Sequence, residues 1–130
     1  AADRQENIRR VAEVAQLAYQ HGQIVLCSFI SPFAQERAMA RQLIPHGHFF
    51  EIYLNCSLEE CVRRDPKGLY ARALEGSISE FTGVSSPYEP PQNPELTLST
   101  DSLSPAEACQ QILNMLRASH ILPPSNPTTP

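Results

Sequence analysis

The sequence predicts an α/β fold with a parallel β-sheet. Three short runs of strand character, at residues 23–29, 49–54 and 95–99, alternate with segments of helical periodicity. The centre of the first run, Ile24-Val25-Leu26-Cys27, is continuously apolar, as in a strand buried on both faces of a parallel sheet. Helices between successive strands favour parallel connections. The length of 130 residues fits a single domain.

One helix is expected on each side of the first strand. In residues 3–20 apolar side chains recur at helical spacing, and Gly22 is placed to end that helix. Ser31-Pro32 predicts the start of a second helix that runs to about Leu43, because Pro suits the first helical position and Ser the cap before it. Pro45 and Gly47 then break the helix before the second strand.

The middle of the chain contains two short helices separated by a break. Ser57-Leu58-Glu59-Glu60 is a capping box that predicts a helix to about Arg64. Asp65-Pro66 interrupts it, because the residue before Pro is pushed out of helical geometry. A second short helix is expected at residues 69–75, ending at Gly76.

The C-terminal third begins with an extended connection and ends in a helix. Four prolines fall between Pro87 and Pro94, before the third strand. Ser104-Pro105-Ala106-Glu107 is a capping box with Pro in the first turn, and it predicts a last helix to about Ser119. We therefore expect a domain at residues 1–119 and a Pro-rich tail or linker at residues 120–130.

Composition limits the partners of this chain. The formal net charge of −4 gives no long-range attraction for nucleic acid or for acidic membranes, and neither is predicted as a partner. No apolar run approaches the roughly 20 residues that a membrane span needs. An anionic ligand must therefore be held by local positive groups.

The cysteine and histidine patterns indicate a reducing compartment and no metal site. The four cysteines form no CxxC pair, and Cys27 is expected to be a buried free thiol, so a cytoplasmic location is predicted. His46 and His48 form an HxH pair beside Pro45 and Gly47, which indicates a loop. Without a third ligand this pair does not predict a metal site.

The most informative segment surrounds the only lysine, Lys67. Four of the ten basic residues fall between residues 63 and 72, on a segment punctuated by Pro66 and Gly68. Such a cluster suits a mobile flap that closes over phosphate or sulfate groups. The alternative is a solvated surface turn.

Three further positions are candidates for ligand contacts. Ser31 follows the first strand and precedes a helix N-terminus, which suits anions, but it could also simply cap that helix. Arg4 and Asn7 share one helix face, either toward a nucleotide or toward solvent. Phe81 could stack on a base or anchor its own loop.

Seven short segments together resemble the adenylyl-sulfate kinases, which phosphorylate adenosine 5′-phosphosulfate (APS) with ATP to give PAPS and ADP. They occur in the family's order between Asp3 and about Leu116. The matching segments are Asp3-Arg4 with Glu6-Asn7-Ile8-Arg9-Arg10, Ala12-Glu13-Val14-Ala15, Ser28-Phe29-Ile30-Ser31-Pro32, Arg64-Asp65-Pro66-Lys67-Gly68-Leu69-Tyr70, Phe81-Thr82-Gly83, Pro87-Tyr88-Glu89 and Pro94-Glu95-Leu96.

The resemblance implies a role for each matched position. The residues that it assigns to APS are Arg4, Asn7, Ile30, Ser31, Lys67, Glu80 and Phe81, with the Phe81 ring on the adenine. Ser31 matches the serine that the family description gives as a phosphoserine intermediate. Arg64 and the Asp101–Leu103 region, Leu103 in particular, are implied to lie near the ATP base. ATP and Mg²⁺ are the implied co-substrate and metal.

The resemblance also implies a larger P-loop kinase-like, three-layer fold. The 130 residues contain no GxxxxGK[ST] motif, which the family carries upstream on its first strand. We therefore expect a copy that lacks the first strand and the ligands for the ATP phosphates and Mg²⁺, and that is inactive by itself. An inactive APS-binding or dimerisation module is the alternative, and a kinase for another small substrate on the same scaffold is a third hypothesis. The family further implies a homodimer, cytoplasmic sulfate assimilation, and fusion to or association with ATP sulfurylase.

Overall fold

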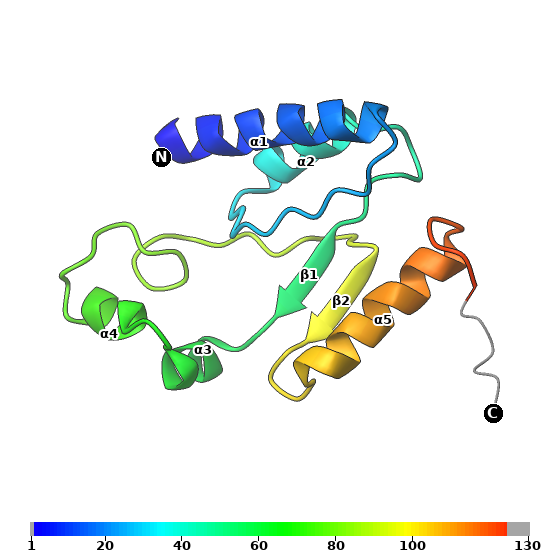
Figure 1. Ribbon diagram of the computed structural model, residues 1–130. Helices are drawn as coiled ribbons and strands as arrows, with labels where there is room; N and C mark the ends of the chain where they lie inside the picture. The colour runs from blue at the N-terminus through cyan, green and yellow to red at the C-terminus, as the bar shows by residue number, and fades with distance from the viewer. Residues whose placement is uncertain (1, 125–130) are drawn as a thin grey trace. The chain divides into compact units, whose positions relative to one another are not determined.

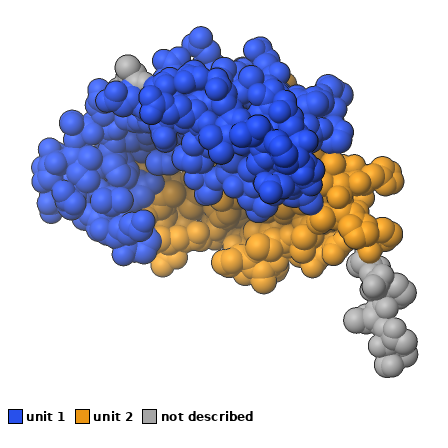
Figure 2. All heavy atoms as spheres, turned by 45° about the horizontal axis from the view of Figure 1, so that its top comes forward, with its two compact units in different colours: residues 1–49, 65–92 blue, residues 50–64, 93–130 orange. Residues whose placement is uncertain are grey.

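The computed structural model describes residues 2–124. Over that range the element order is α1 (Ala2–Gln20), α2 (Ala34–Gln42), β1 (Ile52–Asn55), α3 (Leu58–Arg64), α4 (Leu69–Leu74), β2 (Leu96–Ser99) and α5 (Pro105–Ala118), as Figure 1 shows. The chain divides into two compact units (Figure 2). Unit 1 comprises residues 1–49 and 65–92, and unit 2 comprises residues 50–64 and 93–130.

Unit 2 is built on a parallel pair of strands. β1 and β2 pair with Ile52 opposite Leu96 and Asn55 opposite Ser99, and their arrows run in the same direction in Figure 1. The ladder continues past the strand ends, because the Thr100 amide donates a 2.8 Å hydrogen bond to the Asn55 carbonyl. Helix α5 packs on β2, whose Leu98 is fully buried. The mixed α/β fold with a parallel sheet is thereby confirmed.

Unit 1 packs α1 against α2. Ile8 and Ala12 of α1 are buried, and the Gln16 side chain donates a 2.9 Å hydrogen bond to the carbonyl of Leu43 just after α2. Gly22 ends the helix as expected, because its φ of 78° is a conformation that L-residues other than glycine rarely adopt.

The prediction of a buried strand at residues 23–29 is wrong. Residues 21–30 are all exposed, with Leu26 at 87% and Ile30 at 67%, and Cys27 is an exposed thiol rather than a buried one. Within residues 2–124 no backbone hydrogen bond is made by residues 24–30. A strand exists only through its ladder partners, so the apolar run that predicts one is insufficient without a neighbouring strand on which to pair.

The prediction that Ser31 caps the second helix is also wrong. The helix begins at Ala34 with Phe33 as its N-cap, and the N-cap side chain forms no capping hydrogen bond. Instead, the Ala34 amide donates a 2.7 Å hydrogen bond to the carboxylate of Glu89. A residue distant in sequence thus satisfies the helix start that a local cap was expected to satisfy.

The remaining elements agree with the sequence to within a few residues. The Ser104–Glu107 capping box of α5 is present in both directions, with Pro at the first turn. The segment that contains His46 and His48 is a loop, and the His48 ring lies edge-on against Tyr19 with centroids 5.6 Å apart. Of the predicted tail, residues 125–130 lie outside the described residues. No described helix has the combination of length and hydropathy that would let it cross a bilayer.

Candidate functional site

Arg4 of α1 joins the helix to a distant loop within unit 1. Its Nη1 donates a 3.1 Å hydrogen bond to the Thr82 hydroxyl, and its Nη2 donates a 3.3 Å hydrogen bond to the Glu80 carbonyl. The Glu80 carboxylate lies 3.9 Å from the same guanidinium. Two of the residues assigned to APS by resemblance, Arg4 and Glu80, are therefore brought together, and Arg4 is not a purely solvent-facing side chain.

Asp65 shapes the segment that presents Lys67. Its carboxylate accepts hydrogen bonds from the amides of Tyr70 (3.1 Å) and Ala71 (3.0 Å), so it caps α4 across the intervening turn. Gly68, at φ 64°, closes that turn with a 3.0 Å hydrogen bond to the Asp65 carbonyl. The amide donors, Ala71 first, hold the pKa of Asp65 below its ordinary value, so the cap is ionised at neutral pH. Lys67 is exposed at this turn.

The loop that contains Phe81 is folded on itself. The Phe81 carbonyl accepts hydrogen bonds from the amides of Val84, Ser85 and Ser86, and the Phe81 amide donates a 2.9 Å hydrogen bond to the Ser85 hydroxyl. The half-buried Phe81 ring lies edge-on against Tyr70, with ring centroids 4.9 Å apart. This contact supports the anchoring interpretation of Phe81, and it connects the loop to the α4 segment.

The other residues assigned to APS lie in unit 1 but are not bonded to this cluster. Asn7 and Lys67 are exposed, and their side chains make no hydrogen bond within residues 2–124. Ile30 is exposed, while Ser31 is half-buried at a φ of 40°. Sequence reasoning missed Arg37, which contacts Ser31, and it quoted Glu89 as part of a matching segment without giving it a role.

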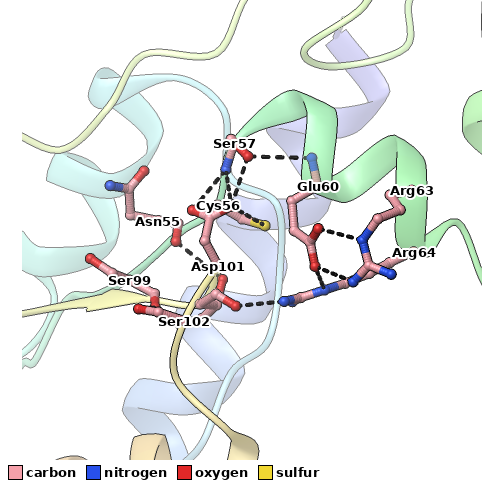
Figure 3. Close-up of polar contacts among 10 residues, drawn as sticks. Asn55, Cys56, Ser57, Glu60, Arg63, Arg64, Ser99, Asp101 and Ser102 are labelled. Carbon is pink, nitrogen blue, oxygen red and sulfur yellow. Dashed lines mark hydrogen bonds and ion pairs between the residues drawn. The ribbon is translucent and has the colours of Figure 1, made fainter.

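In unit 2, Asp101 ties the end of β2 to the start of α3. Its carboxylate accepts hydrogen bonds from the Ser57 amide at 3.2 Å and from the Ser57 hydroxyl at 2.7 Å, as Figure 3 shows. The Ser57 hydrogen bonds hold the pKa of Asp101 below its ordinary value. The predicted capping box is therefore only half formed. The Ser57 hydroxyl accepts a hydrogen bond from the Glu60 amide, but the Ser57 amide donates to the carboxylate of Asp101 rather than to that of Glu60.

Glu60 fixes the two arginines at the end of α3 (Figure 3). Its carboxylate accepts hydrogen bonds from Arg63 and from the Nε of Arg64, and the Nη2 of Arg64 donates a 2.7 Å hydrogen bond to the Thr100 carbonyl. The Arg64 guanidinium is thus held at two of its three nitrogens, which sets the orientation of its plane. A fixed guanidinium plane is suited to stacking on an aromatic base.

Leu103, like Asp101, lies in the connection between β2 and α5. It is half-buried, and its amide donates a 3.1 Å hydrogen bond to the Ser99 carbonyl. Both residues assigned to the ATP base, Arg64 and Leu103, therefore belong to unit 2 and lie in segments that hydrogen-bond to the end of β2.

The Glu60 contacts predict a measurable pH dependence of the folding stability. Hydrogen bonds from Arg63 and then Arg64 lower the pKa of Glu60 from 4.5 to about 2. Because the folded-state pKa is depressed, the stabilisation is fully present above pH 4.5 and is lost as the pH falls toward 2. The melting temperature should therefore fall less steeply over this interval in Glu60→Gln than in the unmodified chain.

Thermal unfolding monitored by circular dichroism at several pH values tests this expectation. Glu59→Gln is the matched control, because it removes a carboxylate from the same helix without touching the Arg63 and Arg64 contacts. Parallel pH profiles for the unmodified chain and Glu60→Gln would contradict the assignment.

The described residues contain no cluster of metal-ligating side chains. Within residues 2–124 there is no group of three or more His, Cys, Asp or Glu side chains placed to hold an ion. None of these residues is therefore assigned to Mg²⁺.

Comparison with known proteins gives a consistent result. The family model for adenylylsulphate kinase matches residues 1–99. The chain is 59% identical to the bifunctional enzyme NodQ of Rhizobium tropici, covering 91% of this chain and 19% of that protein. It is 50% identical to an adenylyl-sulfate kinase of Thermodesulfovibrio yellowstonii, covering 88% of this chain and 58% of that protein.

A solved structure shares both sequence and fold with this chain. The Mycobacterium tuberculosis APS kinase CysC, in complex with AMPPNP and APS, matches with a TM-score of 0.84 and 45% identity, covering 90% of this chain and 68% of that one. The chain thus spans about a fifth of the length of the NodQ relative and a little over half that of the kinase relative. On the match to the family model, the chain belongs to the adenylylsulphate kinase family.

Proposed function

We propose that the protein acts as an adenylyl-sulfate kinase, the enzyme that transfers the γ-phosphate of ATP to the 3′-hydroxyl of APS to form PAPS. The 130 residues by themselves, which contain no GxxxxGK[ST] motif, are expected to bind APS without completing the transfer. The observation that carries this proposal is the meeting of two matched segments in unit 1. Arg4 from α1 is bonded to Glu80 and Thr82, although some 76 residues separate them in sequence. The solved relative that resembles this chain at 45% identity contains APS and AMPPNP.

The APS side of the reaction is assigned to unit 1. Arg4 and Lys67 would neutralise the phosphate and sulfate groups of APS, because cationic donors make strong, charge-assisted hydrogen bonds to such anions. Phe81 would stack on the adenine. Asn7, Ile30 and Ser31 would contact the remainder of the nucleotide. In-line transfer between two bound nucleotides depends on positioning and charge neutralisation, so Ser31 is needed as a substrate contact rather than as a phosphoserine intermediate.

The ATP side is assigned in part to unit 2. The fixed guanidinium of Arg64 offers a flat face for the ATP base, and Leu103 would contact the same base. Mg²⁺ would neutralise the transferring phosphates, as in other phosphoryl transfers. Within residues 2–124 no cluster of three or more His, Cys, Asp or Glu side chains is placed to hold it.

The same resemblance extends to the setting of the protein. We place it in the cytoplasm, where the reducing environment would keep its four free thiols reduced. A homodimer is expected, and sedimentation at twice the monomer mass would support it. Association with ATP sulfurylase is a further proposal, supported by the relatives that are named bifunctional enzymes and are five times longer than the matched segment.

Calorimetric titration of APS into the purified chain tests the substrate assignment. Lys67→Ala should weaken APS binding about 10-fold or more, because it removes a charge-assisted hydrogen bond. Arg10→Ala is the control, since Arg10 is an exposed cation that pairs with Glu6 within α1. Equal losses of APS affinity in the two variants would show that Lys67 acts only through its general positive charge. Absence of APS binding by the folded, unmodified chain would contradict the proposed function.

Two substitutions at Phe81 separate its two interpretations. Phe81→Leu keeps an apolar side chain against Tyr70 but removes the aromatic face, while Phe81→Ala removes both. If the ring stacks on adenine, both variants should lose affinity by about 1–3 kcal/mol, the usual range for base stacking. Retained affinity in Phe81→Leu would show that the ring only anchors its loop.

A further inference from the structure

Arg37 of α2 holds the corner that Ser31 forms before the helix. Its Nη1 donates a 2.7 Å hydrogen bond to the Ser31 carbonyl, and its Nη2 donates a 2.7 Å hydrogen bond to the Glu89 carbonyl. The guanidinium carbon also lies 5.9 Å from the centre of the Tyr88 ring. One half-buried, planar cation therefore bridges two segments of unit 1 that are distant in sequence.

Glu89 closes the same corner from the other segment. Its amide donates a 2.8 Å hydrogen bond to the carbonyl of the fully buried Pro32. Its carboxylate accepts a 2.7 Å hydrogen bond from the amide of Ala34, the first residue of α2. Together with the two hydrogen bonds of Arg37, these contacts form the corner clamp, defined here as Arg37 and Glu89 acting on Ser31 to Ala34.

Ser31, whose carbonyl the corner clamp contacts, has a backbone conformation that serine does not favour. Ser31 has a φ of 40°, within the left-handed region, and it is not glycine, asparagine or aspartate. For such a residue the left-handed conformation is disfavoured by roughly 5- to 30-fold relative to the ordinary conformations. Such a conformation persists where the surrounding structure determines it.

We propose that Arg37 is a positioning residue for the APS site, assisted by Glu89. It holds Ser31 in the left-handed conformation in which the end of the 23–31 segment can meet the substrate. This inference rests on the proposed function, in which Ile30 and Ser31 contact APS. It goes beyond that function because Arg37 and Glu89 reach the substrate only through the Ser31 backbone.

The size of the effect follows from the conformational preference. Without the corner clamp, most molecules would hold Ser31 in a right-handed or extended conformation. The apparent dissociation constant for APS rises in proportion as the binding-competent fraction falls, so Arg37→Ala should weaken APS binding by roughly 5- to 30-fold. Glycine populates positive and negative φ about equally, so the same substitution in a Ser31→Gly background should cost only about twofold.

A double-mutant cycle measured by APS calorimetry tests this coupling. The variants are Arg37→Ala, Ser31→Gly and the double variant. Arg37→Lys is added because lysine keeps the charge but replaces the planar, two-nitrogen fork with a single ammonium nitrogen. Arg41→Ala is the matched control: Arg41 is another half-buried arginine of α2, and it lies over the Phe49 ring. Arg37→Ala could weaken APS binding equally in the Ser31 chain and in the Ser31→Gly background. That result would overturn the proposal, because the cost of losing a general structural role of Arg37 would not depend on replacing Ser31 by glycine.

A ligand-free measurement separates this inference from the proposed function. The three-bond amide coupling and the carbon secondary shifts of Ser31 report its φ by NMR. Positive φ in the unmodified chain and in Arg41→Ala, and its loss in Arg37→Ala and Arg37→Lys, are the expected results. Unchanged Ser31 signals in Arg37→Ala would overturn the inference even if APS binds, whereas absent APS binding with the expected Ser31 signals would overturn only the proposed function.

Discussion

Leu98→Ala is expected to lower the free energy of unfolding of unit 2 by about 2–5 kcal/mol. Leu98 is fully buried in β2, where α5 packs on the strand. Removing its side chain takes away buried apolar surface and leaves a cavity in the packing of the strand. Since small domains are only marginally stable, the variant should unfold at a much lower urea concentration.

Leu54→Ala provides a matched control for this substitution. Leu54 is the register partner of Leu98 on β1, but its side chain is 59% exposed. The same chemical change there should cost well under half as much, as measured by urea unfolding followed by circular dichroism. Equal losses at the two positions would contradict the placement of the unit 2 core at Leu98.

Asp65→Ala is expected to weaken APS binding by roughly 2- to 30-fold under the proposed function. The substitution removes the two hydrogen bonds that cap α4 across the turn carrying Lys67, and loss of a helix cap typically costs about 0.5–2 kcal/mol. A disordered turn would hold Lys67 in its binding position for only part of the time, so the apparent affinity falls with that fraction.

Asp65→Asn is the comparison that isolates the cap. Asparagine keeps an oxygen that can accept from the Tyr70 and Ala71 amides, and it is as good a cap as aspartate. It should retain most of the APS affinity, and it should keep slow hydrogen exchange at those two amides. If Asp65→Ala leaves their exchange unchanged, the carboxylate does not order this turn.

Sequence reasoning succeeded where structure depends on neighbouring residues. The Ser104–Glu107 box and the end of α1 at Gly22 are set by contacts within a single turn of chain, so their residue patterns are sufficient. The β1 and β2 segments were also found, because each of these strand-like segments has the other as its ladder partner. The family assignment followed from short segments in the right order, which do not require knowledge of the contacts.

Sequence reasoning failed where the hydrogen-bond partner of a segment is distant in sequence, or where the described residues provide no neighbouring strand with which it could pair. Ser31 looked like a cap because Ser-Pro is a common helix start, yet the Glu89 carboxylate takes that role. Likewise Asp101, rather than Glu60, completes the cap at Ser57. Residues 23–29 have the composition of a strand, but composition does not provide the hydrogen-bond partners that make one. A local pattern identifies a need for a partner, not which residue meets it.

The most direct test of the central claim is an NMR titration of the isotope-labelled chain, first with APS and then with ADP. The account predicts that APS shifts the amide signals of Arg4, Ser31, Lys67 and Phe81 in unit 1, and that ADP shifts those of Arg64 and Leu103 in unit 2. Saturable shifts confined to these separate sets would establish a substrate site and a nucleotide-base site on this chain. APS shifts absent from unit 1 in a folded sample would contradict the account.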